Sequence, residues 1–393
     1  MIKSIVRILY TLNIEKIFQR LGIEETLRNK LKKAPIVEVK NKRQTPQPIK
    51  YIHIGYPKSA STALQRGFFG SHPQLLHLGC GNLKQNDFWD DHGYISSEIN
   101  IAMEIDLRYK NELNYDPKAT KSIFRKCFDQ AENDLFTHAV GISNENLCFN
   151  WHGGIDTTIK AKRLVEIFGS DTKIIMVIRK QTDLIESLYK ETVRFGYAGT
   201  FDDYLKYLWI YQDRNFLSDF DFSLIYQLYA DLFDKENVGV FFFEEMQNSQ
   251  KGFLENISDF LHLQYTETEI NRVFNKQLSN SALTIKRQLN NKIAHSFERG
   301  YLNPFDTHRH VPYFTETMNE PSLDRDAIFD YHLRNNLNSL SEKLSTLSDY
   351  PPIELSWENS YGQKIKTFYN ASNLKFHNII GGESLTSNGY LEL

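Results

Sequence analysis

The chain has 393 residues, 41% of them hydrophobic, which is enough apolar material to bury one large domain or two ordinary ones. Its 46 basic and 49 acidic residues nearly cancel and leave a formal net charge of −3, which argues against a general nucleic-acid binder. Cys80, Cys127 and Cys148 are too few and too widely spaced to form a disulfide framework or a metal-binding pattern.

The first 49 residues are predicted to form a helical arm and a linker. Residues 2–22 carry apolar side chains at helical spacing, with basic residues on the other faces. Such a helix fits packing on the domain, and it also fits weak association with a membrane surface. No stretch is apolar enough to span a bilayer and no secretory signal is recognisable, so we expect a cytoplasmic protein.

From residue 50 onward, short apolar runs alternate with segments of helical period. The strand candidates are 51–55, 138–143, 172–179 and 238–246, and the helix candidates are 61–69, 158–169, 184–196 and a segment through 253–261. This alternation predicts an α/β domain of three layers, with a parallel sheet and helices on both faces.

The remaining segments are assigned around that domain, which we place at 50–350. The polar and aromatic residues 80–137 are predicted to be an insertion that caps the domain and binds the acceptor. Residues 351–393 are predicted to be a C-terminal extension, and its sequence from residue 355 onward is strand-like in composition.

The segment IGYPKSASTAL (54–64) runs from the first predicted strand through a tight loop into a helix. A helix N-terminus offers unpaired backbone N–H groups, to which Lys58 adds a charge and Ser59, Ser61 and Thr62 add hydroxyl groups. The segment therefore predicts a phosphate or sulfate site. It lacks the Walker A pattern, because Lys58 precedes the hydroxyl cluster instead of following a glycine-rich run. A serine-rich helix cap with a solvated lysine is the structural alternative.

YPKSAST (56–62) resembles the 5′-phosphosulfate loop of the sulfotransferases that use 3′-phosphoadenosine 5′-phosphosulfate (PAPS). The resemblance implies a P-loop-type sheet and implies that PAPS is bound by the segment's Pro57, Lys58, Ser59, Ala60, Ser61 and Thr62. Ala60 departs from the family, which usually has Gly there. The loop must hold Ala60 at negative φ or accept strain.

IIMVIRKQTDLIESLY (174–189) carries Arg179 at the end of a buried strand and Ser187 on the following helix. Family members place Arg and Ser similarly, and the resemblance implies that the two bind the 3′-phosphate of PAPS. A guanidinium at a strand end suits that role, because its planar fork matches phosphate oxygens. The structural alternative is a pair between Arg179 and Asp183.

Sulfuryl transfer needs a base for the acceptor hydroxyl and stabilisation of the leaving phosphate. Lys58 is expected to serve the leaving group, and no metal is required. Glu145, just past the 138–143 strand, is the first candidate for the base and His152 is the second. His72, His77 or an acid within 86–106 are the remaining candidates.

We expect the acceptor to be a carbohydrate hydroxyl on a glycan or polysaccharide. Aromatic rings alternate with short polar side chains in 82–115 and again in 194–212, as a saccharide cleft requires. The alternative is that these rings pack the cap. The alternative functions are a P-loop-type kinase and a non-catalytic glycan-binding protein on a sulfotransferase core. The kinase would require a Walker-like loop, which this sequence lacks.

Overall fold

The computed structural model describes residues 47–79, 88–90, 93–95, 97–134, 136–150, 155–214, 216–267, 278–296, 336–347 and 349–392. The chain divides into two compact units, Met1–Pro46 and Gln47–Leu393. All described residues belong to the second unit, so the predicted helix over 2–22 lies outside them.

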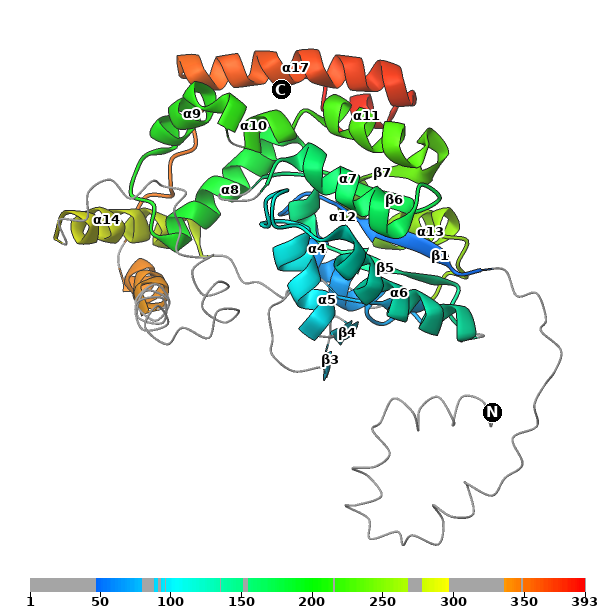
Figure 1. Ribbon diagram of the computed structural model, residues 1–393. Helices are drawn as coiled ribbons and strands as arrows, with labels where there is room; N and C mark the ends of the chain where they lie inside the picture. The colour runs from blue at the N-terminus through cyan, green and yellow to red at the C-terminus, as the bar shows by residue number, and fades with distance from the viewer. Residues whose placement is uncertain are drawn as a thin grey trace, which may run out of the picture. The chain divides into compact units, whose positions relative to one another are not determined.

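A five-stranded parallel sheet forms the centre of the second unit (Figure 1), with the strand order β2-β5-β1-β6-β7. The strands are β1 (Ile49–His53), β2 (Leu75–His77), β5 (Ala139–Ser143), β6 (Lys173–Ile178) and β7 (Val238–Phe242). The four strands predicted from the sequence are confirmed. The edge strand β2 is not among them, because three residues are too few to show a recognisable strand pattern.

Alternate residues of the strands enter two separate hydrophobic cores, one on each face of the sheet. In β6, Ile174, Met176 and Ile178 pack in one core while Ile175 and Val177 pack in the other. Since successive side chains of a strand point to opposite faces, both faces of the sheet are covered. The predicted three-layer arrangement is confirmed.

Helices cover both faces. The first core receives side chains from α6 (Pro117–Asn133), α7 (Thr157–Phe168), α8 (Gln181–Phe195) and α11 (Phe222–Phe233). The second core receives them from the π-helix η1 (Leu64–Phe69), which continues α4 (Ser61–Ala63), and from α13 (Gln250–Phe260). The remaining helices used below are α9 (Phe201–Ile210), α10 (Phe216–Asp219), α12 (Phe243–Asn248) and α14 (Asn280–Ser296).

The predicted insertion at 80–137 contains a small antiparallel hairpin, β3 (Phe88–Asp90) and β4 (Gly93–Ile95). β4 lies against β2 and η1. α5 (Ser97–Ile101) and the π-helix η2 (Ala102–Asp106) follow, and then α6, which packs on α7 and β5. Part of this segment therefore belongs to the core of the domain.

The strand-like interpretation of the residues after 355 is wrong. They form the long helix α17 (Ser360–Ile380) and the short helix α18 (Ser384–Ser387). The Asn359 side chain caps the start of α17, and Gly381, at φ 68°, ends it. The aromatic residues that suggest a strand lie at helical spacing, with Tyr369 and Phe376 buried.

Candidate functional site

Four strand ends meet at one edge of the sheet. The carboxyl ends of parallel strands lie on the same side, where α/β proteins bind their ligands. β1 leads into the loop of residues 54–60, β5 into Glu145, β6 into Arg179 and β7 into Glu244. The two sequence motifs are thus on neighbouring strands, with β1 paired directly to β6.

The 54–60 loop has an unusual backbone. It leaves β1 beside β6, where Tyr56 N donates to Val177 O at 3.1 Å. Lys58 and Ala60 then adopt φ angles of 62° and 65°, both in the left-handed region. The sequence allowed Ala60 either a negative φ or a strained backbone, and the strained backbone is observed. A non-glycine residue in the left-handed region costs about 1–2 kcal/mol.

Ser59 is fully buried in this loop, and within the described part of the chain its Oγ has no hydrogen-bond partner. A buried hydroxyl without a partner is costly, so a ligand oxygen at this place would satisfy it. The neighbouring Ser61 Oγ donates to Tyr56 O at 3.2 Å and supports the turn of the loop.

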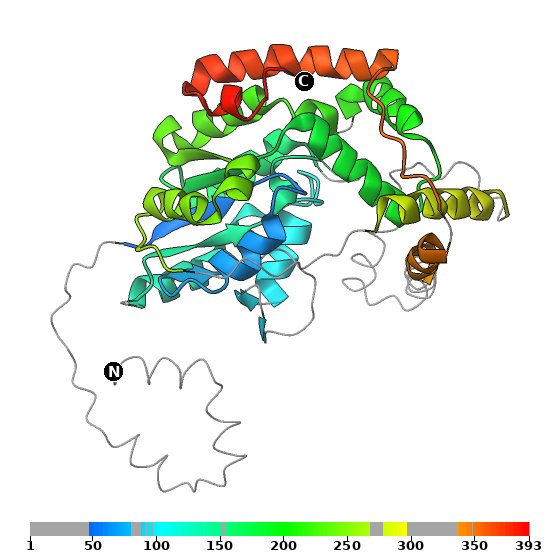
Figure 2. The same cartoon turned by 180° about the vertical axis from the view of Figure 1, so that it is seen from behind.

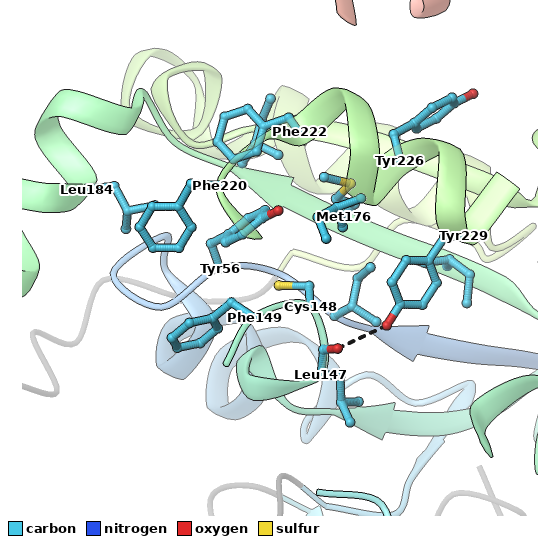
Figure 3. Close-up of a cluster of buried hydrophobic side chains, with 14 of the residues drawn as sticks. Tyr56, Leu147, Cys148, Phe149, Met176, Leu184, Phe220, Phe222, Tyr226 and Tyr229 are labelled. Atoms are coloured by element: carbon cyan, nitrogen blue, oxygen red, sulfur yellow. Dashed lines mark hydrogen bonds between the residues drawn. The ribbon is translucent and has the colours of Figure 1, made fainter. Parts of the chain in front are cut away.

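Beneath the loop lies a buried cluster of aromatic rings (Figure 3). Tyr56 packs edge-on against Phe220, and its hydroxyl donates to Asp219 O at 2.8 Å. Tyr229 donates to Leu147 O at 3.1 Å, which connects α11 to the segment after β5. The Tyr56 bond attaches the loop to α10, and the Tyr229 bond holds the segment after β5.

The two motifs are in direct contact. Arg179 Nη1 donates to Lys58 O at 2.8 Å, and its guanidinium lies 4.8 Å from the centre of the Phe243 ring. Burial lowers the pKa of Arg179, while the nearby Asp183 and Glu244 carboxylates oppose that shift. The guanidinium therefore bonds the loop, and among the described residues it makes no hydrogen bond or ion pair with Asp183.

The cationic end of Lys58 is paired with α8. Its Nζ lies 3.1 Å from Glu191 Oε2, and Arg194 Nη1 lies 2.7 Å from the same oxygen. Ser187 is buried on the same helix, one turn before Glu191. Glu191 was not among the predicted site residues, because nothing local in the sequence connects it with Lys58.

Glu145 begins the short helix η3 (Glu145–Leu147) immediately after β5. Gln65 Nε2 donates to Glu145 Oε2 at 3.4 Å and to Ser143 Oγ at 3.0 Å. Ser143 Oγ in turn lies 2.7 Å from His53 Nδ1, and burial lowers the pKa of His53 to about 3. A neutral histidine, a serine and an amide therefore support the carboxylate from the sheet side.

The alternative bases are placed differently. His152 lies outside the described residues. Both ring nitrogens of His72 are bonded, Nδ1 to Gln74 N and Nε2 to Gln264 O. His77 is buried and its Nδ1 bonds the Tyr51 hydroxyl at 2.9 Å.

Among the described residues of the 86–106 segment, Glu104 and Asp106 are buried acids, and Asp106 pairs with Lys110 at 2.6 Å. Glu104 is the one beside Asn144. It pairs with Arg108 and accepts a hydrogen bond from Asn144 at 3.3 Å. Burial raises the pKa of Glu104, although Arg108 opposes the shift. These partners give it a structural role beside Glu145.

A buried lysine that the sequence did not single out holds the segment after β5. Lys160 Nζ donates to Asn146 O at 2.9 Å and to Phe149 O at 2.7 Å. Asp219, whose pKa is raised by burial, accepts from Asn150 N at 2.6 Å. The backbone oxygen of Asp219 also accepts a hydrogen bond from the Tyr56 hydroxyl, so Asp219 connects this segment with the 54–60 loop.

A family model described as "Sulfotransferase domain" matches residues 48–322. The chain belongs to the sulfotransferase family. Members of this family are enzymes that take a sulfuryl group from PAPS, so the predicted family and enzyme class are confirmed. No curated protein matches the chain significantly.

Three sulfotransferases are among the solved structures to which the chain is similar. One from Alicyclobacillus acidocaldarius is 17% identical, with a TM-score of 0.41 over 65% of this chain and 98% of its own. The sulfotransferase domain of the Synechococcus PCC 7002 olefin synthase is 16% identical, with a TM-score of 0.31 over 79% and 98%. A mouse sulfotransferase complexed with PAP is 12% identical, with a TM-score of 0.30 over 76% and 89%. The assignment rests on the family model.

The residues at the sheet edge fit the family's sulfuryl donor. The unpartnered Ser59 hydroxyl and the lysine and arginine nearby form a donor set suited to anionic groups. Among the described residues there is no group of three or more His, Cys, Asp or Glu that could hold a metal. None of the described helices is long and apolar enough to cross a membrane.

Proposed function

We propose that the protein transfers the sulfuryl group of PAPS to a hydroxyl of a carbohydrate, on a glycan or polysaccharide. In this proposal Pro57, Lys58, Ser59, Ala60, Ser61 and Thr62 surround the 5′-phosphosulfate, and Arg179 and Ser187 bind the 3′-phosphate. The observation that supports it most directly is the hydrogen bond from Arg179 to Lys58 O, which joins the two predicted anion sites.

Glu145 is proposed as the general base. Its carboxylate takes the proton of the acceptor hydroxyl while the acceptor oxygen forms its bond to sulfur. The bond from sulfur to the bridging oxygen breaks, and adenosine 3′,5′-bisphosphate (PAP) leaves. Lys58 and backbone N–H groups of the loop stabilise the charge that develops on that oxygen. Support for Glu145 comes from its place at the end of β5, beside β1, and from its contact with Gln65.

The carbohydrate acceptor is supported by the β3–β4 hairpin. Trp89 and Tyr94 are register partners across its two strands. The hairpin lies against η1, which continues the helix after the 54–60 loop. Aromatic residues in a segment at this position suit the recognition of a sugar acceptor.

Other rings from the predicted cleft are used in packing. The Tyr115 ring lies 3.9 Å from the Arg163 guanidinium, and Tyr197 and Tyr204 pack against Tyr189. The packing alternative therefore describes these residues, and the acceptor proposal rests on the hairpin. The cytoplasmic location and the weak membrane contact of residues 2–22 stay predictions.

The test is a competition among saccharides, simple phenols, sterols and tyrosine peptides, each incubated with labelled PAPS. Sulfation of saccharides is expected, and it should fall in a Trp89→Ala variant.

Glu145→Gln should reduce turnover by about 10²–10⁴ while PAPS affinity is kept, as for a lost general base. Glu166→Gln, on the α7 surface, is the control. Efficient sulfation of phenols or sterols with no saccharide product contradicts the acceptor assignment, and normal turnover of Glu145→Gln contradicts the base.

A further inference from the structure

The C-terminal extension lies beyond residues 48–322, which the family model matches. Figures 1 and 2 show α17 running along the outside of the domain, over α9 and α11. Three polar contacts connect the extension with the elements that carry Arg179 and Ser187.

The first contact is made by Trp357, which is 8% exposed. Its Nε1 donates to Glu186 Oε1 at 2.8 Å, and its ring packs edge-on against Phe201. Glu186 immediately precedes Ser187 on α8. The extension therefore fixes the helix beside the predicted phosphate-binding serine.

The second contact lies at the start of α8. The side-chain amides of Gln181 and Asn373 exchange two hydrogen bonds, of 2.7 and 3.0 Å, and both residues are fully buried. Asn373 Nδ2 also donates to Tyr390 O at 2.8 Å. Because buried amides must be paired, this arrangement specifies one position for the start of α8, two residues after Arg179.

The third contact is made by Tyr390, which is fully buried with its ring edge-on to Phe242 at 5.7 Å. Its hydroxyl donates to Glu244 Oε2 at 2.8 Å, while Glu244 Oε1 accepts from Lys180 N at 2.9 Å. Burial, followed by the Glu244 charge, raises the pKa of Tyr390, so the hydroxyl keeps its proton and remains a donor. Glu244 thus bridges the end of the extension to the turn that follows Arg179.

Arg179 lies between these contacts. Its guanidinium lies over the ring of Phe243, which is the neighbour of Glu244 in the sequence. The residue after Arg179 is Lys180, and its backbone N–H donates to the Glu244 carboxylate. The Glu244 carboxylate is close enough to the Arg179 guanidinium to favour its charged form. The position of the guanidinium is therefore defined on one side by the loop, through Lys58 O, and on the other by the extension.

We propose that the C-terminal extension positions the 3′-phosphate end of the nucleotide site, with Tyr390 as the positioning residue that holds the Arg179 turn through Glu244. This inference rests on the proposed function, in which Arg179 and Ser187 bind the 3′-phosphate. It assigns a role in donor recognition to a segment outside the matched family domain.

The experiment compares the affinities of PAP and adenosine 5′-monophosphate (AMP), which lacks the 3′-phosphate, by calorimetry on the full chain. In Tyr390→Phe, which removes only the hydroxyl, the Kd for PAP should rise about three- to tenfold, as for one lost hydrogen bond. The Kd for AMP should change less than twofold. Tyr369→Phe is the matched control, because Tyr369 is also buried in the extension but donates to Leu217 O at 2.8 Å. It should change neither Kd.

An Arg179→Ala variant separates the two proposals. It should weaken PAP about ten- to a hundredfold and AMP much less. If it affects PAP and AMP equally, the proposed 3′-phosphate role of Arg179 fails and the inference fails with it. If Arg179→Ala discriminates but Tyr390→Phe does not, or if Tyr369→Phe acts like Tyr390→Phe, the inference alone is overturned. Thermal melting of each variant shows that binding is measured on folded protein.

Discussion

Lys58 Nζ lies 3.1 Å from Glu191 Oε2, so the lysine expected to hold the phosphosulfate is paired with a carboxylate. The two side chains are only 20% and 13% exposed, so water screens them little. Arg194 shares the same carboxylate oxygen and remains as its partner when Lys58 turns to an anionic ligand. In the proposed function, Glu191 therefore competes with the donor for Lys58.

Glu191→Gln is expected to tighten PAP binding about three- to tenfold, because it removes a negative charge that competes for Lys58. Calorimetry with PAP measures the change. Glu255→Gln is the control, since Glu255 also pairs with a lysine, Lys251, but on α13. Unchanged or weaker PAP binding in Glu191→Gln means that the pair does not oppose the ligand.

Lys58→Ala should reduce turnover by at least about 10²–10³, the loss typical of removing one group that stabilises a developing negative charge. The fold should persist, because Glu191 keeps Arg194 as a partner. Turnover with saturating PAPS and far-ultraviolet circular dichroism test the two statements, with Lys162→Ala on the exposed side of α7 as control. A folded Lys58→Ala protein with near-normal turnover contradicts the placement of PAPS in this loop.

Ala60→Gly should leave the stability unchanged or raise it by up to about 1 kcal/mol. Glycine relieves the left-handed strain at φ 65°, and its greater freedom in the unfolded chain offsets part of that gain. Ala63→Gly is the control, because Ala63 has a helical φ of −66° and should lose about 1 kcal/mol. Urea denaturation measures the free energy of unfolding of both variants. Equal losses of stability in Ala60→Gly and Ala63→Gly would mean that Ala60 is not strained.

The strands could be predicted because their signals are local: runs of apolar residues mark β1, β5, β6 and β7. The resemblance of two short segments predicts Lys58 and Arg179 as anion-binding residues, and the fold brings these two residues into contact. The supporting groups could not be predicted, because their partners lie far away in sequence. Lys58 and Glu191 are 133 positions apart, and Gln181 and Asn373 are 192 apart. Only the folded domain brings them together.

Composition predicted less well the secondary structure after residue 355 and the role of the aromatic side chains, because tertiary packing determines both. The aromatic residues after 355 suggested strands, yet a cap at Asn359 and helical spacing make α17. The rings at Tyr115 and Tyr197 suggested a saccharide cleft, but arginine and tyrosine neighbours surround them. An aromatic side chain has the same signature in a sequence whether it packs a core or lines a cleft.

The buried Lys160 should make the free energy of unfolding of the protein depend on pH. Burial lowers its pKa to about 8, with Arg108 acting in the same direction and Asp219, Cys148 and Asp156 opposing it. Between about pH 8 and its ordinary value of 10.5, the unfolded chain binds the proton more tightly than the folded chain. Stability contributed by this group therefore rises with pH in that window.

Lys160→Met removes the charge and the two hydrogen bonds to Asn146 O and Phe149 O. The stability difference between the natural protein and this variant should grow in favour of the natural protein by about 2 kcal/mol from pH 8 to pH 10. Urea denaturation at each pH measures it, and taking the difference cancels the other titrating groups. A difference for Lys160→Met that stays constant over this range means that the lysine is protonated in the folded protein throughout.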